Sequence, residues 1–243
     1  MSRPIAMILG VGAIHGIGGA LCLRAAAAGH HVLAVGRTRK KLDALVETIA
    51  AAGGTAEGHV VDLSNTDQIT DIFEAVDSHS GKLDFVTYNA GNSFRHETTD
   101  MAANFFEDAW RICCFGGFIA GQAAVNRMTA GGGGTLLFTG ATASLKSRPP
   151  FLAFASAKAA LRAAAAGLAR EYGPKGVHVG HVIIDGGVEG AIRRKRLPKD
   201  QDSAGENELL LPDAIAEAYW QLHQQHPSAW SFEIDLRPFN EVF

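Results

Sequence analysis

The sequence predicts a single α/β domain built on a doubly wound parallel sheet of about seven strands, with helices on both faces. Two observations predict this fold. Short apolar runs alternate with helical stretches along the chain, which indicates parallel strands joined by right-handed crossovers. The first apolar run, residues 5–9, also breaks into four glycines within residues 10–18 before an alanine-rich helical stretch. This order of strand, tight turn and helix is typical of nucleotide-binding folds.

The glycine turn carries the first chemical signal. The spacing Gly12-x-x-x-Gly16-x-Gly18 lets backbone N–H groups approach a pyrophosphate closely, and the N-terminus of the following helix favours its negative charge. The structural alternative is a glycine-rich turn between a buried strand and a helix, and a glycine pattern alone is weak evidence. The nucleotide interpretation is favoured because further polar residues fall at the same edge of the predicted sheet.

Composition restricts the class of protein. The chain has 243 residues, 47% of them apolar and 19% charged, which is ordinary for one globular domain. A net charge of -3 argues against nucleic acid as the main partner. Three cysteines, two of them adjacent, make no disulfide framework and favour a cytoplasmic location. Pro4 and the glycines argue against a signal peptide, and no apolar run is long enough to predict a membrane span.

The second predicted strand, residues 31–35, ends in a basic run. Arg37 lies about 20 residues past the glycine turn, where a dinucleotide fold meets the adenosine ribose. No acidic residue precedes Asp43 in this run. A guanidinium suits a 2′-phosphate, so the sequence predicts NADP rather than NAD. The structural alternative is the solvated start of the next helix.

Polar residues follow the next two predicted strands. Asp62 follows the third strand, where its carboxylate can accept from an adenine amino group or begin a turn with Ser64 and Asn65. Residues 89–91 (Asn-Ala-Gly) close the fourth strand. Ligands sit at the carboxyl ends of parallel strands, so these residues converge on the glycine turn. The remaining elements are predicted from apolar periodicity: helix 42–52, strand 59–62, helix 66–80, strand 83–87, helix 153–169, strand 177–184, a helix from residue 211 and strand 231–236.

Residues 12–18 (GAIHGIG), Asp62, residues 89–91 and residues 154–158 (FASAK) resemble the short-chain dehydrogenase/reductase family over nearly the whole chain. The resemblance implies that one Rossmann-like domain spans residues 1–243, with a variable substrate segment at 187–211. It also implies a set of candidate cofactor-binding residues at the carboxyl edge of the sheet: Gly12, His15, Gly16, Ile17, Gly18, Arg37, Thr38, Asp62, Leu63, Asn89, Ala90, Gly91, Lys158 and Val188.

The catalytic half departs from the family pattern. The family uses Asn, Ser, Tyr and Lys, with the last two spaced Y-x-x-x-K. Lys158 stands at the lysine position, but Phe154 stands at the tyrosine position. The same resemblance points to Ala141 for the serine and Cys113 for the asparagine. A carbonyl that takes hydride must be protonated or hydrogen-bonded, and phenylalanine has no proton to give.

Other hydroxyl groups offer a substitute donor. Thr142, one residue beyond the expected serine, is the favoured candidate, with water as the alternative. Thr139 and Ser144 are further candidates, and Ser156 ranks lower because it lies on another face of the helix. Structural roles in strand ends, turns and caps are favoured for all of these except Thr142, for which the two roles are balanced. The family resemblance gives Lys158 a second role, hydrogen-bonding the nicotinamide ribose.

The sequence therefore predicts an NADP(H)-dependent oxidoreductase that acts on a carbonyl or alcohol, with Lys158 and Thr142 as catalytic residues. Two alternatives remain: a dinucleotide-binding sensor or assembly subunit with little turnover, and a reductase of polarised C=C bonds. We expect small-molecule substrates, no nucleic-acid or membrane partner, and a homodimer or homotetramer through the alanine-rich helix. The basic run 193–196 is interpreted as a solvated lid rather than a nucleic-acid site. No motif with metal-ligand spacing is present, so no metal is predicted.

Overall fold

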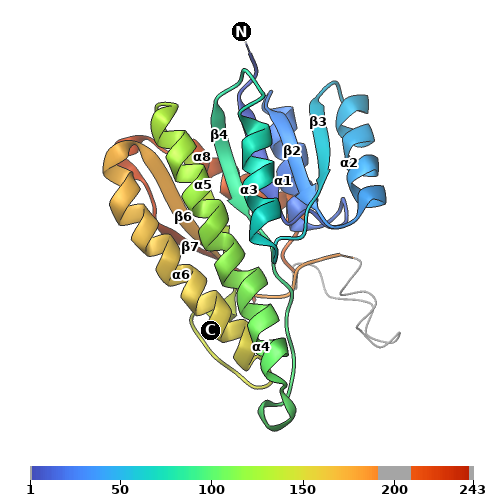
Figure 1. Cartoon of the computed structure of the whole chain (residues 1–243), viewed down its shortest axis with the longest axis vertical. Coiled ribbons are helices and arrows are strands. Elements are labelled where there is room, and N and C mark those ends of the chain that lie inside the picture. Colours follow the sequence, from blue (N-terminus) through green and yellow to red (C-terminus); the bar gives the residue numbers. More distant parts are fainter. Residues whose placement is uncertain (1, 191–208, 241–243) are drawn as a thin grey trace.

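The computed structural model describes residues 2–190 and 209–240 and confirms the predicted parallel sheet (Figure 1). The order across the seven-stranded sheet is β3-β2-β1-β4-β5-β6-β7, and every neighbouring pair is parallel. The order reverses between β1 and β4, which makes that junction the point where such sheets bind ligands. The strands are β1 (Ile5–Leu9), β2 (His31–Gly36), β3 (Thr55–Val60), β4 (Leu83–Tyr88), β5 (Gly134–Thr139), β6 (Val177–Ile184) and β7 (Glu233–Leu236).

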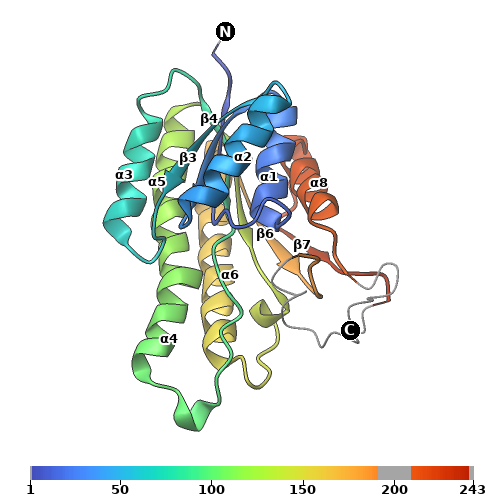
Figure 2. The same ribbon diagram turned by 90° about the vertical axis from the view of Figure 1, so that its right-hand side faces the viewer.

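Helices cover both faces of the sheet. Figure 2 shows α1, α2 and α8 on one face and α3, α5 and α6 on the other, with α4 extending beyond the carboxyl edge. The helices are α1 (Ile17–Ala27), α2 (Arg39–Ala51), α3 (Thr66–Val76), α4 (Ala103–Trp110), α5 (Gly116–Ala130), α6 (Leu152–Tyr172) and α8 (Pro212–His223).

Two apolar cores lie on the two faces of the sheet. Alternate residues of a strand point to opposite faces, so Met7 packs with the α3, α5 and α6 side while Ile8 packs with the α1, α2 and α8 side. Tyr88 and Phe138 are fully buried in the first core. Because both faces are covered, the strands read as nearly continuous apolar runs, which is why the sequence located most of them.

The third strand and the helix after it differ from the prediction. β3 runs from Thr55 to Val60, whereas the sequence suggested residues 59–62. It is an edge strand whose polar and half-exposed residues give no apolar signal. α3 ends at Val76 rather than near residue 80, and turns follow in which the His79 N–H donates to the Val76 carbonyl at 3.0 Å. Asp62 therefore lies just past the end of β3.

The connection between α4 and α5 is a π-helical turn, Arg111–Phe115. Its wider winding holds Cys113 and Cys114 inward, where both are buried. The Tyr88 hydroxyl donates to the Ile112 carbonyl at 2.7 Å and so ties the turn to the end of β4. Such π-turns occur often at functional sites.

Helix α6, counted with the turn that follows it (Leu152–Lys175), is long and apolar enough to span a membrane by length and composition. The sequence had indicated no such stretch. Core helices pass the same test, and Ala153, Leu161 and Ala165 of α6 are buried inside the domain.

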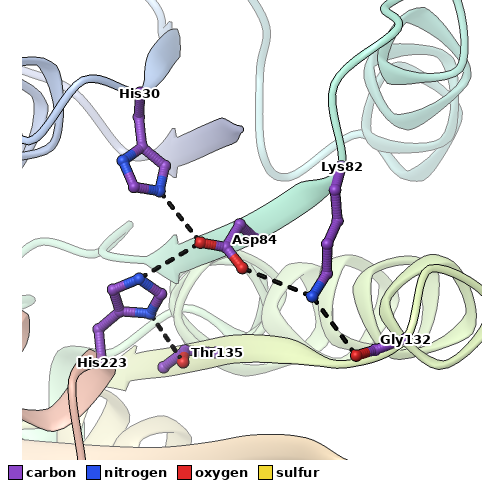
Figure 3. A network of polar contacts seen from close by, with 6 residues as sticks. All are labelled: His30, Lys82, Asp84, Gly132, Thr135 and His223. Atoms are coloured by element: carbon purple, nitrogen blue, oxygen red, sulfur yellow. Dashed lines mark hydrogen bonds and ion pairs between the residues drawn. The ribbon is translucent and has the colours of Figure 1, made fainter. Parts of the chain in front are cut away.

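At the amino edge of the sheet, Asp84 of β4 contacts His30, Lys82 and His223 (Figure 3). Its Oδ2 lies 3.1 Å from the His30 Nε2 and 3.4 Å from the His223 Nε2. Its Oδ1 lies 3.7 Å from the Lys82 Nζ, and the His223 Nδ1 lies 2.9 Å from the Thr135 hydroxyl. The two imidazoles, His223 first, hold the pKa of the Asp84 carboxyl well below its usual range.

Candidate active site

The glycine turn at the end of β1 allows two backbone segments to approach each other. Gly10 has a φ of +102°, and a Cβ there would lie 2.5 Å from the Ala90 nitrogen, so only glycine fits. A Cβ at Gly18 would likewise lie 2.8 Å from the Gly10 carbonyl oxygen. Gly12 is exposed, and a Cβ there would have no neighbour within 4 Å, so the outer side of the turn is open. The turn thus brings the ends of β1 and β4 together at the reversal point of the sheet.

The start of α1 leaves its backbone donors free for a ligand. Its N-cap, Gly16, supplies no side-chain hydrogen bond, and no acidic residue lies in the first turn. His15 is exposed on the turn, while Ile17, the first helical residue, is half-buried. This arrangement fits a phosphate at the helix N-terminus.

Arg37 follows the end of β2, as predicted. Its side chain is exposed and makes no hydrogen bond or ion pair with the residues that the structure describes. The neighbouring Arg39, in contrast, donates to the Gly58 carbonyl at 2.9 Å and pairs with Asp43 at 3.7 Å. Arg37 is therefore the guanidinium that is available to a ligand at this position. Thr38 forms the N-cap of α2 without a side-chain hydrogen bond.

Asp62 and Leu63 follow β3. The Asp62 carboxylate accepts from the Ser64 N–H at 3.0 Å and from the Ser64 hydroxyl at 2.8 Å, the turn-forming role predicted beside adenine binding. These bonds, from the backbone first, lower the pKa of Asp62, and the charge of Arg37 adds a smaller effect. Arg37 and Asp62 thus lie close enough to interact. The Leu63 side chain is buried, so only its backbone is positioned to face a ligand.

Asn89 holds three strands together at the reversal point. Its Nδ2 donates to the Gly10 carbonyl at 3.0 Å, and its Oδ1 accepts from the Thr139 hydroxyl at 3.0 Å. The Thr139 hydroxyl also lies 2.8 Å from the Tyr219 hydroxyl. Both Thr139 and Tyr219 are buried, so the Thr139 hydroxyl is used in structure.

Lys158 is buried at the carboxyl edge. The residue is only 3% exposed, and its Nζ donates to the Thr139 carbonyl at 2.7 Å. Burial lowers the pKa of Lys158, while the nearby thiols of Cys113 and Cys114 act in the opposite direction. A Cβ at Gly91 would lie 3.3 Å from both the Cys113 Sγ and the Lys158 Nζ. The ammonium, a thiol and the Asn-Ala-Gly turn thus meet at one point.

Phe154 lies beside Lys158 in an apolar setting. Its ring centroid is 5.9 Å from the Lys158 Nζ, and the ring packs against the cluster of Cys113, Cys114 and Ala157. Burial raises the pKa of the Cys113 thiol, with the Lys158 ammonium opposing this shift. The place that resembles the family's tyrosine position is therefore occupied by a ring that cannot donate a proton.

The Thr142 hydroxyl donates to Asp185 Oδ1 in a short hydrogen bond. Asp185 follows β6, and its other oxygen lies 3.0 Å from the Arg237 Nη2. The partnership with Asp185 was not foreseen from the sequence, because 43 residues separate the two side chains. Thr142 is thus oriented by a carboxylate rather than standing alone.

The alternative hydroxyls have structural roles. Ser144 is buried, and its Oγ accepts from the Ala141 N–H at 3.1 Å, which matches the turn-capping role predicted beside catalysis. The Ser156 Oγ donates to the Leu152 carbonyl within α6 at 2.8 Å.

The two described ends of the variable segment pair with each other. Val188 forms a parallel bridge with Leu210, and the Glu189 N–H donates to the Leu210 carbonyl at 2.9 Å. This places Val188 just past the end of β6, near the carboxyl edge. The basic run 193–196 lies outside the described residues.

Comparisons with known proteins place this geometry in context. A family model described as short chain dehydrogenase matches residues 6–201. A short-chain dehydrogenase from Rhodopseudomonas palustris has 36% sequence identity, covers 97% of this chain and 99% of its own, and superposes with a TM-score of 0.83.

Two further proteins are similar. The 3beta-hydroxysteroid dehydrogenase of Mediterraneibacter gnavus is 30% identical over 175 residues, which span 70% of this chain and 62% of that protein. A metagenomic short-chain oxidoreductase, whose structure was solved in complex with NADP, shares 24% identity over 98% of both chains with a TM-score of 0.80. At that identity the likeness concerns the fold.

Proposed function

This chain belongs to the short-chain dehydrogenase/reductase family, and from this premise we propose that it is an NADP(H)-dependent oxidoreductase acting on a carbonyl or alcohol through a non-standard active site. The observation that carries the proposal is the buried Lys158 ammonium beside Gly91, at the same edge as the glycine turn. Burying a cation raises the free energy of the folded state unless a partner stabilises its charge. No acidic side chain of residues 2–190 and 209–240 pairs with Lys158.

The residues present fit a phosphorylated dinucleotide. The open outer side of the glycine turn and the uncapped start of α1 suit a pyrophosphate. The unpaired Arg37 suits a 2′-phosphate, and Asp62 lies close to it. Lys158 would hold the ribose at the nicotinamide end. When bound, the coenzyme supplies or accepts the hydride, and the protein contributes binding, orientation and proton handling.

We assign proton handling to Thr142. Its oxygen can accept the proton of a substrate alcohol while its own hydrogen passes to the Asp185 carboxylate. The carbon that bears this hydroxyl gives up a hydride, so oxidation yields a carbonyl and a protonated Asp185. Reduction runs the same path backwards, with the proton moving from Asp185 through Thr142 to the developing alkoxide. A water molecule in place of Thr142 is the alternative.

The apolar surroundings of Phe154 favour one rival function. A dinucleotide-binding protein with little turnover would keep the coenzyme contacts and lose the proton donor, which is the combination described around Lys158 and Phe154. Reduction of a polarised C=C bond also needs no phenol beside the substrate oxygen.

Binding and turnover separate these functions. Calorimetry with NADPH and NADH tests the coenzyme, and a panel of ketones, aldehydes, alcohols and enones tests turnover. We expect binding of NADPH and oxidation or reduction of at least one carbonyl or alcohol. Thr142→Val and Asp185→Asn should each lower kcat by about a hundredfold or more, whereas Ser156→Ala should not. Tight NADPH binding without turnover across the panel would support the sensor instead, and turnover of enones alone would support C=C reduction.

We also propose self-association and a cytoplasmic location. The outer side of α6 carries small residues, and a Cβ at Gly167 there would have no neighbour within 4 Å. Trp110 and Phe118 are 38% and 40% exposed near the α4–α5 junction and stack on the ring of Phe115. Small residues and exposed aromatics are the surfaces that a symmetric partner would cover.

A further inference from the structure

Three imidazoles converge on one carboxylate at the outer strands of the sheet. The Glu57 Oε1 lies 3.3 Å from the His31 Nε2, and its Oε2 lies 3.4 Å from the His59 Nε2 and 3.8 Å from the His79 Nε2. These residues come from β2, β3 and the turns after α3. We propose that His31, Glu57 and His79 form a site for a divalent transition-metal ion, with Zn²⁺ as the preferred ion, and that His59 lies beside this site.

The distances suit a metal ion. Zn²⁺ binds imidazole nitrogen and carboxylate oxygen at about 2.0–2.2 Å, so ligands at tetrahedral positions lie about 3.3–3.5 Å apart. The separation of 3.3 Å between the Glu57 Oε1 and the His31 Nε2 matches this spacing, and the His79 Nε2 lies 3.8 Å from the Glu57 Oε2. The ligand atoms of His31, Glu57 and His79 all lie within 4.8 Å of one another. Small side-chain shifts therefore bring the ligands around one ion.

Two of the histidine nitrogens that face Glu57 make no hydrogen bond within the described residues. The Nε2 atoms of His31 and His59 are shielded from solvent and have no hydrogen-bond partner within the described part of the chain. A neutral imidazole that directs its lone pair at a carboxylate is repelled unless a cation lies between them.

The second contact of His31 supports the same assignment. Its Nδ1 lies 3.0 Å from the Thr55 hydroxyl, which also accepts from the Arg3 guanidinium at 3.3 Å. In the tautomer that donates from Nδ1–H to Thr55, the lone pair of His31 lies on Nε2, the atom that faces Glu57. Metal-bound histidines commonly use their other ring nitrogen in this way.

The Asp84 network of Figure 3 also joins two histidines and a carboxylate, but a lysine already lies 3.7 Å from that carboxylate. His30 lies at hydrogen-bonding distance from Asp84, His223 contacts Thr135 through its other nitrogen, and Lys82 lies near the carboxylate. Glu57 has no lysine or arginine partner among residues 2–190 and 209–240. The free ligand set is therefore the one around Glu57.

The proposed site is open to an entering ion. His31 and His79 line a surface pocket together with Arg3, Thr55 and Ser80. A bound ion would link two adjacent strands to the turns between α3 and β4. We therefore expect it to stabilise this side of the sheet without contacting the coenzyme edge.

Titration of the tag-free full chain with Co²⁺ and Zn²⁺ tests the proposal, and neither ion requires NADPH to be bound. We expect one Co²⁺ per chain, visible d–d absorption, no thiolate charge-transfer band and displacement of Co²⁺ by Zn²⁺. Glu57→Gln and His79→Ala should each weaken Zn²⁺ binding at least about tenfold. Their positions are exposed or half-exposed, so the fold should persist, as circular dichroism can check. His226→Ala, which removes an exposed histidine elsewhere, should leave binding unchanged.

Three outcomes would overturn the site. The wild-type chain could bind less than one Co²⁺. A thiolate band could appear, which would move the metal to a cysteine such as Cys113 or Cys114. Alternatively, a folded Glu57→Gln/His79→Ala double variant could retain wild-type affinity. As a second measurement, Zn²⁺ should raise the Tm of the wild type but not that of the double variant.

Discussion

The Lys158 ammonium donates to the backbone carbonyl of Thr139 at 2.7 Å, which links α6 to the carboxyl end of β5. The carbonyl belongs to the residue whose hydroxyl binds Asn89. The lysine is thereby fixed relative to the end of β4 and the Asn-Ala-Gly turn. The fold therefore sets the position of Lys158 even though Phe154 stands where the family has its tyrosine. Coenzyme binding by the lysine and proton donation at position 154 can be tested separately.

Lys158→Met should separate stability from coenzyme binding. Methionine fills similar volume without a buried charge, so we expect the free energy of unfolding to stay equal or rise. Loss of a charged hydrogen bond to the coenzyme should weaken NADPH binding by about 10–100-fold. Denaturant unfolding and fluorescence titration measure the two quantities. Lys175→Met in the exposed turn after α6 serves as the control, and unchanged NADPH affinity in Lys158→Met would remove the assigned role.

Arg37→Ala should change coenzyme preference. A charge-assisted bond to a 2′-phosphate contributes about 1.5–3 kcal/mol, so NADPH binding should weaken by about 10–100-fold while NADH binding stays the same. Arg39→Ala is the matched control, because that guanidinium is already occupied by Gly58 and Asp43. Equal losses for both coenzymes would contradict recognition of the 2′-phosphate.

Phe154→Tyr should create a proton donor. The ring lies 5.9 Å from the Lys158 Nζ, so a phenol there would come close to an ammonium that favours its ionised form. We expect ketone reduction to rise by about a hundredfold or more, measured as NADPH oxidation. Phe151→Tyr, at the start of the same helix, should give no gain. If neither variant reduces ketones, the coenzyme and substrate are not placed beside this position.

Acid should destabilise the fold through its buried histidines. Burial, the first cause, lowers the pKa values of His178 and His181 below about 6.5. Below that pH the unfolded chain binds more protons than the folded chain, so the stabilisation is present above about pH 6.5 and is lost as pH falls. Urea unfolding at pH 7.5 and 5.5 should show a decrease of up to about 1.4 kcal/mol per pH unit for each histidine. His181→Asn should reduce the slope, and stability that rises on acidification would refute the explanation.

Gly167→Glu should disrupt self-association. The position is exposed in the middle of α6, and a charge placed there would be buried by a symmetric partner. We expect light scattering to show a dimer or tetramer for the wild type and a smaller species for the variant. Gly167→Ala is the control, because it keeps the surface small and favours the helix. A wild-type monomer at working concentrations would end the proposal.

The sequence predicted which segments meet at the carboxyl edge of the sheet because their signals are local. A glycine turn, an arginine after β2 and an Asn-Ala-Gly turn after β4 each follow a buried strand, and a parallel sheet brings such positions together. β3 was misplaced because Glu57 and its neighbours at the sheet edge give no apolar pattern.

The sequence could not indicate contacts between distant segments. Thr142 and Asp185 come from different crossovers, and no spacing rule connects them. The histidines around Glu57 lie at positions 31, 59 and 79, a spacing that matches no metal-binding motif, so the sequence predicts no metal there. The pairing of β2 with β3, together with the turns after α3, brings these residues to one carboxylate.

The Asn89 side chain must present a hydrogen-bond donor at one end and an acceptor at the other. One end of its amide must give a hydrogen to Gly10, and the other must receive one from Thr139. Aspartate has the same shape but two oxygens, so it would set like partial charges face to face with the Gly10 carbonyl. An acid at this position would therefore weaken the contact between the ends of the first and fourth strands before any coenzyme arrived.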